Sequence, residues 1–199
     1  MNRRQKMAVN ASNVLVGAPD QLVTGAICDA PLGTKLPTHA LDKINAAFED
    51  SGYISEDGVS LSLKTSTETI RDWSAAGIRQ ILKEFTGTVK WTELEVSKKS
   101  LERAFGTDSV TTEAAGQDHG TRVSVAIGAQ IPSPRSWVFK IKDGKKKVLL
   151  VVPNGQATIS DDISFTSSDA ATIGIELNCA PDERGKNIYI YTDDGVFSA

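Results

Sequence analysis

The side chains best suited to catalysis or metal binding are few and widely spaced in this sequence. It contains two histidines, His39 and His119, and two cysteines, Cys28 and Cys179. These are zinc-ligand types, but they lack the paired short spacings of zinc-binding sequences. Asp118 precedes His119, yet neighbouring residues point in different directions in most conformations. We therefore predict no metal site, and we expect both cysteines to be buried apolar side chains.

Motifs for nucleotide binding or nucleophilic catalysis are also missing from the sequence. It has no GxSxG, HExxH or P-loop motif, and no GxGxxG followed by a strand-helix pattern. Its acidic pairs adjoin turn residues and lack the regular spacing of a calcium-binding loop. These pairs are Glu49-Asp50, Glu56-Asp57, Asp161-Asp162 and Asp193-Asp194. We predict that the protein is not an enzyme and uses no cofactor.

The bulk composition describes a globular protein without a strong attraction to nucleic acid. A chain of 199 residues with 40% hydrophobic residues can form one sizeable core, so we expect a single domain over 1–199. The formal net charge is -3, which provides no positive field for a phosphate backbone. No window approaches the ~18 uninterrupted apolar residues of a membrane-spanning helix, so we expect no membrane insertion.

Alternation of apolar and polar residues dominates the sequence after residue 58 and predicts β-strands. Asp143-Gly144 is a strong signal for a two-residue turn, so the strands beside it should form a hairpin. The second of these strands, around residues 148–152, has no polar face and must be covered on both sides, by its own fold or by a neighbouring subunit. The predicted strands lie near 59–63, 123–127, 136–142, 145–152, 171–179 and 187–192. In the last of them we expect the isoleucines, rather than the tyrosines, to face inward.

Turn-forming residues interrupt the remaining segments. Residues 1–58 should form an arm with short extended pieces, including a one-sided helix near 40–48. Residues 65–77 should form the loop or tip of a ribbon, because they end in small residues. Pro153-Asn154-Gly155 should end the strand before it, with a further strand near 157–166.

One short helix is well marked, at about 98–105. Ser97 can cap its first turn, and Gly106 stands where helices commonly end. The capping box should be incomplete, because Ser100 replaces the usual Glu or Gln at the third helical position. Short spaced strands, one helix and no strand-helix-strand alternation predict a mainly β fold, an antiparallel barrel or sandwich over 59–199.

Several stretches resemble the major tail tube proteins of long non-contractile-tailed bacteriophages, especially those that infect actinobacteria. The most specific stretch is Gly52-Tyr53-Ile54-Ser55-Glu56-Asp57-Gly58. Others are Ala30-Pro31-Leu32-Gly33-Thr34, Ile70-Arg71-Asp72-Trp73, Trp137-Val138-Phe139, Val151-Val152-Pro153-Asn154-Gly155-Gln156 and Tyr189-Ile190-Tyr191-Thr192-Asp193-Asp194-Gly195. The family's usual start resembles Met7 onward, so either Met1 or Met7 is the first residue, and no immunoglobulin-like domain is expected after Ala199.

The resemblance implies a structural virion protein, assembled in the host cytoplasm, whose β-barrel or sandwich subunits form stacked hexameric rings. The resulting tail tube would conduct DNA into the host. Its partners would be further copies of itself, the tape measure protein, the tail terminator and the distal tail proteins. We expect the ribbon at 59–96 and the N-terminal arm to make contacts within and between rings. The candidate interface residues are Ile70, Arg71, Asp72, Trp73 and Ile78.

Two other readings are open at this stage. The chain could be another tail or injection-system component, such as a tail terminator or the tube protein of a contractile system. It could also be a monomeric β-sandwich that binds a ligand. A terminator should stop at one ring, and a binding module should not assemble at all.

Overall fold

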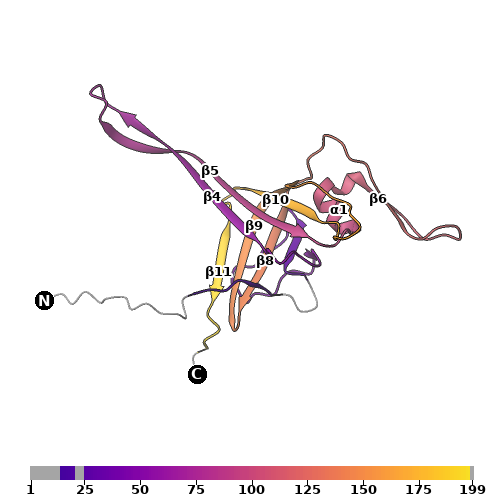
Figure 1. The fold of residues 1–199 in the computed structure, drawn as a ribbon. Coiled ribbons are helices and arrows are strands. Elements are labelled where there is room, and N and C mark those ends of the chain that lie inside the picture. Colours follow the sequence, from indigo (N-terminus) through magenta and orange to yellow (C-terminus); the bar gives the residue numbers. More distant parts are fainter. Residues whose placement is uncertain (1–13, 21–24, 198–199) are drawn as a thin grey trace.

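The computed structural model describes residues 14–20 and 25–197, and Figure 1 shows its elements. In chain order these are β1 (Ala18–Pro19), β2 (Ile27–Pro31), β3 (Glu49–Asp50), β4 (Ser60–Arg71), β5 (Gly77–Glu93), α1 (Lys98–Phe105), the 3-10 turn η2 (Thr107–Ser109), β6 (Val110–Glu113), β7 (Arg122–Val125), β8 (Arg135–Asp143), β9 (Lys146–Ile159), β10 (Ile173–Ala180) and β11 (Tyr189–Asp193). The predicted fold class, mainly β with one short helix, is confirmed.

Nine strands form one antiparallel sheet in the order β3-β2-β8-β9-β10-β5-β4, with β1 added to β8 and β11 added to β9. Strand β9 joins the two halves of this sheet. Its first part pairs with β8 and β11, and its second part, from Asn154, pairs with β10. The path ends at β3 and β4, which do not pair with each other in the described part of the chain. The arrangement is therefore sandwich-like, and the closed barrel considered from the sequence is not formed.

The core lies where the two halves of the sheet face each other. Trp91 of β5 packs against Trp137 and Phe139 of β8, with ring centroids 5.3 and 5.4 Å apart. Aromatic residues bury large areas, so this trio contributes strongly to the hydrophobic stabilisation of the fold. The buried residues of the main core also include Ile27, Val89, Leu150, Val152, Ile173, Ile175 and Leu177.

The predicted hairpin of β8 and β9 is confirmed, with Gly144 at a positive φ of 59° in its turn. Both faces of the apolar stretch in β9 are covered by the protein's own fold. Leu150 and Val152 face the main core, and Leu149 and Val151 face a second cluster on the other side of the sheet. That cluster is completed by Leu36, Ile44, Phe48, Tyr189 and Tyr191.

The helix at 98–105 is confirmed with these bounds, but its capping box is complete. The Ser97 amide donates to the Ser100 hydroxyl at 2.7 Å, and the Ser100 amide donates to the Ser97 hydroxyl at 3.2 Å. The prediction of an incomplete box was wrong because a serine oxygen at the third helical position accepts this hydrogen bond as Glu or Gln would.

The predicted helix near 40–48 is wrong, because this segment consists of turns. The Asp42 carboxylate accepts hydrogen bonds from the Thr38 and His39 amides, and the Asn45 side chain accepts one from the Ala47 amide. Such local side-chain bonds to the backbone compete with helix formation.

Two strand predictions were also wrong in detail. Residues 153–155 do not end β9 but bend it, since the register shifts between the pairs Trp137 with Val152 and Arg135 with Gly155. Of the two isoleucines expected to face inward near 187–192, Ile188 packs against the main core, but Ile190 of β11 is 55% exposed. The tyrosines face the second cluster because Tyr189 pairs with Val151, and cross-strand partners share a face.

The bend in β9 leads to a prediction about Gly155. A Cβ atom there would lie 2.8 Å from Leu177 Cδ1 and 2.9 Å from Trp137 Cδ1, so Gly155→Ala should overpack the core. We expect a loss of about 1–3 kcal/mol in the free energy of unfolding, measured by urea denaturation. Gly128→Ala is the matched control, because a Cβ at Gly128 meets no atom within 4 Å. Equal stability of the two variants would contradict this account of the bend.

Candidate subunit interface

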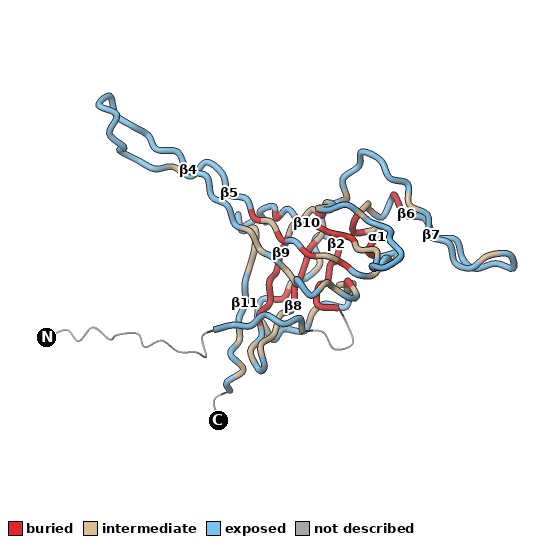
Figure 2. The backbone as a smooth tube through the Cα atoms, in the orientation of Figure 1, coloured by how far each residue is buried: buried red, intermediate tan, exposed pale blue. Residues whose placement is uncertain are grey.

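The long hairpin of β4 and β5 leaves the body of the protein (Figure 1). Strand β10 pairs with β5 only as far as Gly87, and beyond that point β5 pairs with β4 alone in the described chain. No residue from 64 to 86 is buried, as the exposed colouring of this hairpin shows (Figure 2). An isolated two-stranded hairpin is at best marginally stable in water, so this projecting part is a candidate for contact with another surface.

One face of the hairpin continues the apolar face of the core. Residues 61, 63, 65 and 67 alternate along β4 on one face, and they pair with Val89, Gly87, Phe85 and Leu82. Val89 is fully buried, whereas Leu63, Phe85 and Leu82 are 55%, 41% and 63% exposed. We call these three exposed residues the apolar hairpin face. The sequence analysis missed them, although the alternation that begins at Val59 continues through Leu63.

The five candidate interface residues all lie at the tip of this hairpin. Ile70 and Ile78 are 43% and 64% exposed, and Trp73 has a relative exposure of 105%. Trp73 therefore makes no packing contact with the core of its own chain. Exposed aromatic residues of this kind are enriched in the centres of protein interfaces.

The tip is held in shape by hydrogen bonds. Asp72 Oδ1 accepts from the Ser74 hydroxyl at 2.7 Å and from the Ala76 amide at 2.9 Å. These bonds, the Ser74 hydroxyl above all, lower the pKa of the Asp72 carboxyl. Arg71 Nη1 donates to the carbonyl of Ala75 at 2.9 Å, where Ala75 has a positive φ of 63°. The turn thus presents Trp73 on a defined loop.

A second arm, formed by β6 and β7, leaves the body on the opposite side in the view of Figure 1. The strand predicted near 123–127 is present as β7, which ends at Val125. Val123 is 40% exposed and Ile127 is 72% exposed, because β7 pairs with the four-residue strand β6 outside the main sheet. Within this arm, the Glu113 carboxylate of β6 lies 3.3 Å from His119 Nε2 and 3.5 Å from Arg122 Nη1 of β7.

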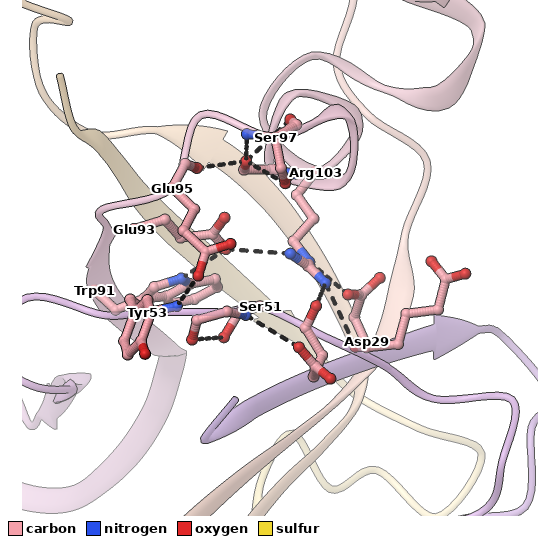
Figure 3. A network of polar contacts seen from close by, with 12 residues as sticks. Asp29, Ser51, Tyr53, Trp91, Glu93, Glu95, Ser97 and Arg103 are labelled. Atoms are coloured by element: carbon pink, nitrogen blue, oxygen red, sulfur yellow. Dashed lines mark hydrogen bonds and ion pairs between the residues drawn. The ribbon is translucent and has the colours of Figure 1, made fainter. Parts of the chain in front are cut away.

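A buried polar network lies where β5 ends and α1 begins (Figure 3). Arg103 of α1 donates from Nε to Asp29 of β2 at 2.5 Å and from Nη2 to the carbonyl of Asp50 at 2.6 Å. The second carboxylate oxygen of Asp29 accepts from Arg135 Nε at 2.5 Å. The helix is therefore linked to β2, β3 and β8 by charged hydrogen bonds that are shielded from water.

Glu93, the last residue of β5, occupies the same network and is completely buried. Its Oε1 accepts from Trp91 Nε1 at 3.2 Å and lies 3.6 Å from Arg103 Nη1. Among the described residues, Glu93 Oε2 and Arg103 Nη1 have no hydrogen-bond partner. Burial raises the pKa of Glu93 to about 7, although the charge of Arg103 acts in the opposite direction.

The remaining residues with reactive side chains do not come together. His39 is exposed beside Thr38, and no group of three or more His, Cys, Asp or Glu side chains in the described chain is placed to hold a metal ion. The prediction that Cys28 and Cys179 are buried is confirmed. Burial raises the pKa of both thiols, that of Cys179 to about 12. None of the helices in the described residues is long and apolar enough to cross a membrane.

The network predicts a specific pH dependence of stability. Because the pKa of Glu93 rises from 4.5 to about 7 on folding, the folded state binds the proton more tightly. The protonated Glu93 side chain contributes to the free energy of unfolding in full below pH 4.5. This contribution, at most about 3 kcal/mol, is lost as the pH rises through 7. Glu93→Gln, which mimics the protonated form, should remove this decline between pH 5 and 8 in urea denaturation. Glu176→Gln should retain it, since Glu176 pairs with Lys90 at the surface. An unchanged decline in Glu93→Gln would contradict the assignment.

Comparison with known proteins identifies the family. The sequence matches the family described as phage tail tube protein over residues 7–197, and no curated protein matches it. Among solved structures, the chain is similar to the tube-terminating cap of the anti-feeding prophage. The two have 14% identity and a TM-score of 0.44, with 94% of this chain and 100% of that chain covered. The matched family comprises structural virion proteins without enzymatic activity. Since the family match spans nearly all of the sequence, the chain belongs to the phage tail tube proteins.

Proposed function

We propose that this chain assembles with copies of itself into hexameric rings, which stack into the tail tube of a long non-contractile-tailed phage. The tube would conduct DNA into the host during infection. The observation that carries the proposal is the β4–β5 hairpin. Its apolar face continues that of the core but lies outside the core and is exposed. Contiguous apolar surface of this kind marks a protein interface.

The exposed strand edges support assembly from identical copies. Strand β4 ends the path of the main sheet, so its outer edge carries unpaired backbone groups along Ser60–Arg71 within the described structure. Among the described strands, β11 pairs with β9 alone, which leaves its outer edge open there as well. Because these are different edges, pairing between them joins one surface to another surface on the next copy. Such heterologous contacts generate rings when the rotation closes.

The charge of the subunit suits a conduit. A tube that lets DNA slide must not pair extensively with phosphates, because each pairing releases counterions and strengthens binding. The formal net charge of -3 is consistent with a lining that does not hold DNA. The tape measure protein, the tail terminator and the distal tail proteins are the proposed partners inside the tube and at its ends.

Shortening the hairpin should abolish assembly but not folding. Residues 66–84 would be replaced by Asn-Gly, so that the new turn joins Thr65 to its partner Phe85. The core does not include the removed residues, so the urea unfolding transition should be retained. Negative-stain microscopy of concentrated protein should show tubes for the wild type and none for the variant. Tubes of normal diameter from the shortened chain would rule out the proposed role of the hairpin.

A second pair of variants separates the apolar face from the length of the hairpin. Leu82→Thr with Phe85→Thr keeps the strands but removes two residues of the apolar hairpin face, and we expect it to abolish tubes. Ser62→Thr with Ser66→Thr places the same side chain on the opposite face and should leave assembly intact. A wild-type protein that stops at single rings would instead indicate a terminator.

The conduit role predicts weak binding to DNA. At about 0.15 M salt, duplex DNA should be retained by the purified protein no more tightly than the usual non-specific range, roughly 10⁻⁴ to 10⁻⁶ M. Electrophoretic mobility of labelled DNA, with increasing protein, measures this directly. Binding that is tighter than this range and survives moderate salt would contradict a sliding channel.

A further inference from the structure

Trp73 differs from the other two tryptophans of the chain. Trp91 and Trp137 are 3% and 1% exposed in the core, whereas Trp73 is fully exposed on a turn shaped by Asp72. Ordering a large apolar side chain in water has no benefit for a monomer. The turn is preorganised to present this side chain to another surface, which lowers the entropy cost of binding.

A pocket of suitable chemistry lies at the other end of the same hairpin. A cavity of about 280 Å³ is enclosed by β1, the start of β2, residues 54–59 and β8. Its apolar lining is formed by Ala26, Ile27, Ile54, Val59, Phe139 and Ile141. The volume is about nine times the ~30 Å³ that one water occupies and lies below the range of drug-sized ligand pockets. It is the size of a site for one large side chain.

The charges around the tip and the pocket are complementary. Glu56 and Asp57 line the pocket, and Arg71 and Arg79 stand beside Trp73 and Ile70 at the tip. Lys140 also lines the pocket. The tip carboxylate of Asp72 is already engaged in its own turn. An approaching tip would therefore bring guanidinium groups towards two carboxylates.

The distance between tip and pocket excludes a contact within one chain. Val59, at the pocket, directly precedes β4, and Trp73 lies two residues beyond the end of that strand at Arg71. A strand rises about 3.3 Å per residue, so the tip lies roughly 40 Å from the pocket along the hairpin. A contact between the tip of one copy and the pocket of another is head-to-tail, because each copy then offers a free tip and a free pocket. Such a contact closes into a ring when its rotation closes and otherwise propagates along a line. We assign it to the line, because the proposed pairing of strand edges already joins copies within a ring.

We infer that Trp73 of one copy inserts into the pocket formed by residues 17–19, 54–59 and 139–141 of a second copy in the next ring, with Arg71 facing Glu56 and Asp57. This contact rests on the proposed assembly into a tube. It assigns the tip and the pocket to stacking between rings, and it leaves the strand edges to join copies within a ring.

Disulfide trapping tests the contact directly. Ser74→Cys places a thiol beside Trp73, and Ala18→Cys places one at the pocket, where Ala18 is exposed. In assembled tubes under mild oxidation, the double variant should yield a ladder of covalent multimers on non-reducing gels. Ser74→Cys with Ala170→Cys is the matched control, since Ala170 is exposed but does not line the pocket, and it should yield no ladder. The native cysteines are buried and should give none either.

The outcomes separate this contact from the proposed function. Tubes that form without the Ala18 ladder would overturn the contact while supporting assembly, and would mean that another segment or another tail protein covers the pocket. A ladder from the Ala170 control as strong as that from Ala18 would also overturn it. Failure of the wild-type chain to assemble would overturn the proposed function, and this contact with it.

Tryptophan fluorescence and a charge exchange give independent readouts. Assembly should shift the emission of Trp73 to shorter wavelength, and the shift should be absent in Trp73→Phe, because the other two tryptophans are already buried. Arg71→Glu should lose tubes, and its combination with Glu56→Arg and Asp57→Arg should recover them. An unchanged emission on assembly, or no recovery in the combined variant, would overturn the inference.

Discussion

Strand β5 lies in two different environments, and the rest of the structure depends on which neighbouring strands its backbone hydrogen bonds join. From Gly87 to Lys90 it lies between β4 and β10, and from Trp91 to Glu93 it pairs with β10, with Val89 and Trp91 in the core. Before Gly87 it pairs with β4 alone, and the same alternation continues onto a surface that no other described segment covers. The period of two in a strand cannot distinguish these environments. A single continuous strand therefore carries the core's apolar face out to where a neighbour can bury it.

The buried network at the end of β5 gives that projecting strand a fixed base. Arg103 contacts Asp29, Asp50 and Glu93, so α1, β2, β3 and β5 meet at one guanidinium group. Burying charges is costly unless they are paired and hydrogen-bonded, and here two polar atoms lack a hydrogen-bond partner within the described structure. Such a network is a weak source of stability but restricts the geometry of the elements that enter it.

The sequence predicted those features that depend on local patterns. The β8–β9 turn at Asp143-Gly144 and the helix after Ser97 are short-range signals, and both are confirmed. It could not predict that Ile190 is exposed, because that depends on the register of β11 against β9. Nor could it distinguish the buried Val89 from the exposed Phe85, since both belong to the same alternating pattern. Asp29, Glu93 and Arg103 lie far apart in the sequence, and only the topology brings them together.

The size of the apolar hairpin face limits how strongly it could hold two copies together in the proposed assembly. Burying the exposed parts of Leu63, Leu82 and Phe85 contributes of the order of 1 kcal/mol each. Association costs roughly 4–15 kcal/mol in lost freedom, so this face cannot hold two copies together by itself. Several contacts must form at once, and their combined strength grows because a copy held at one surface is presented to the next at high effective concentration. We therefore expect the proposed assembly to be cooperative: an isolated pair should dissociate, whereas a complete ring would offer every incoming subunit all of its contacts together.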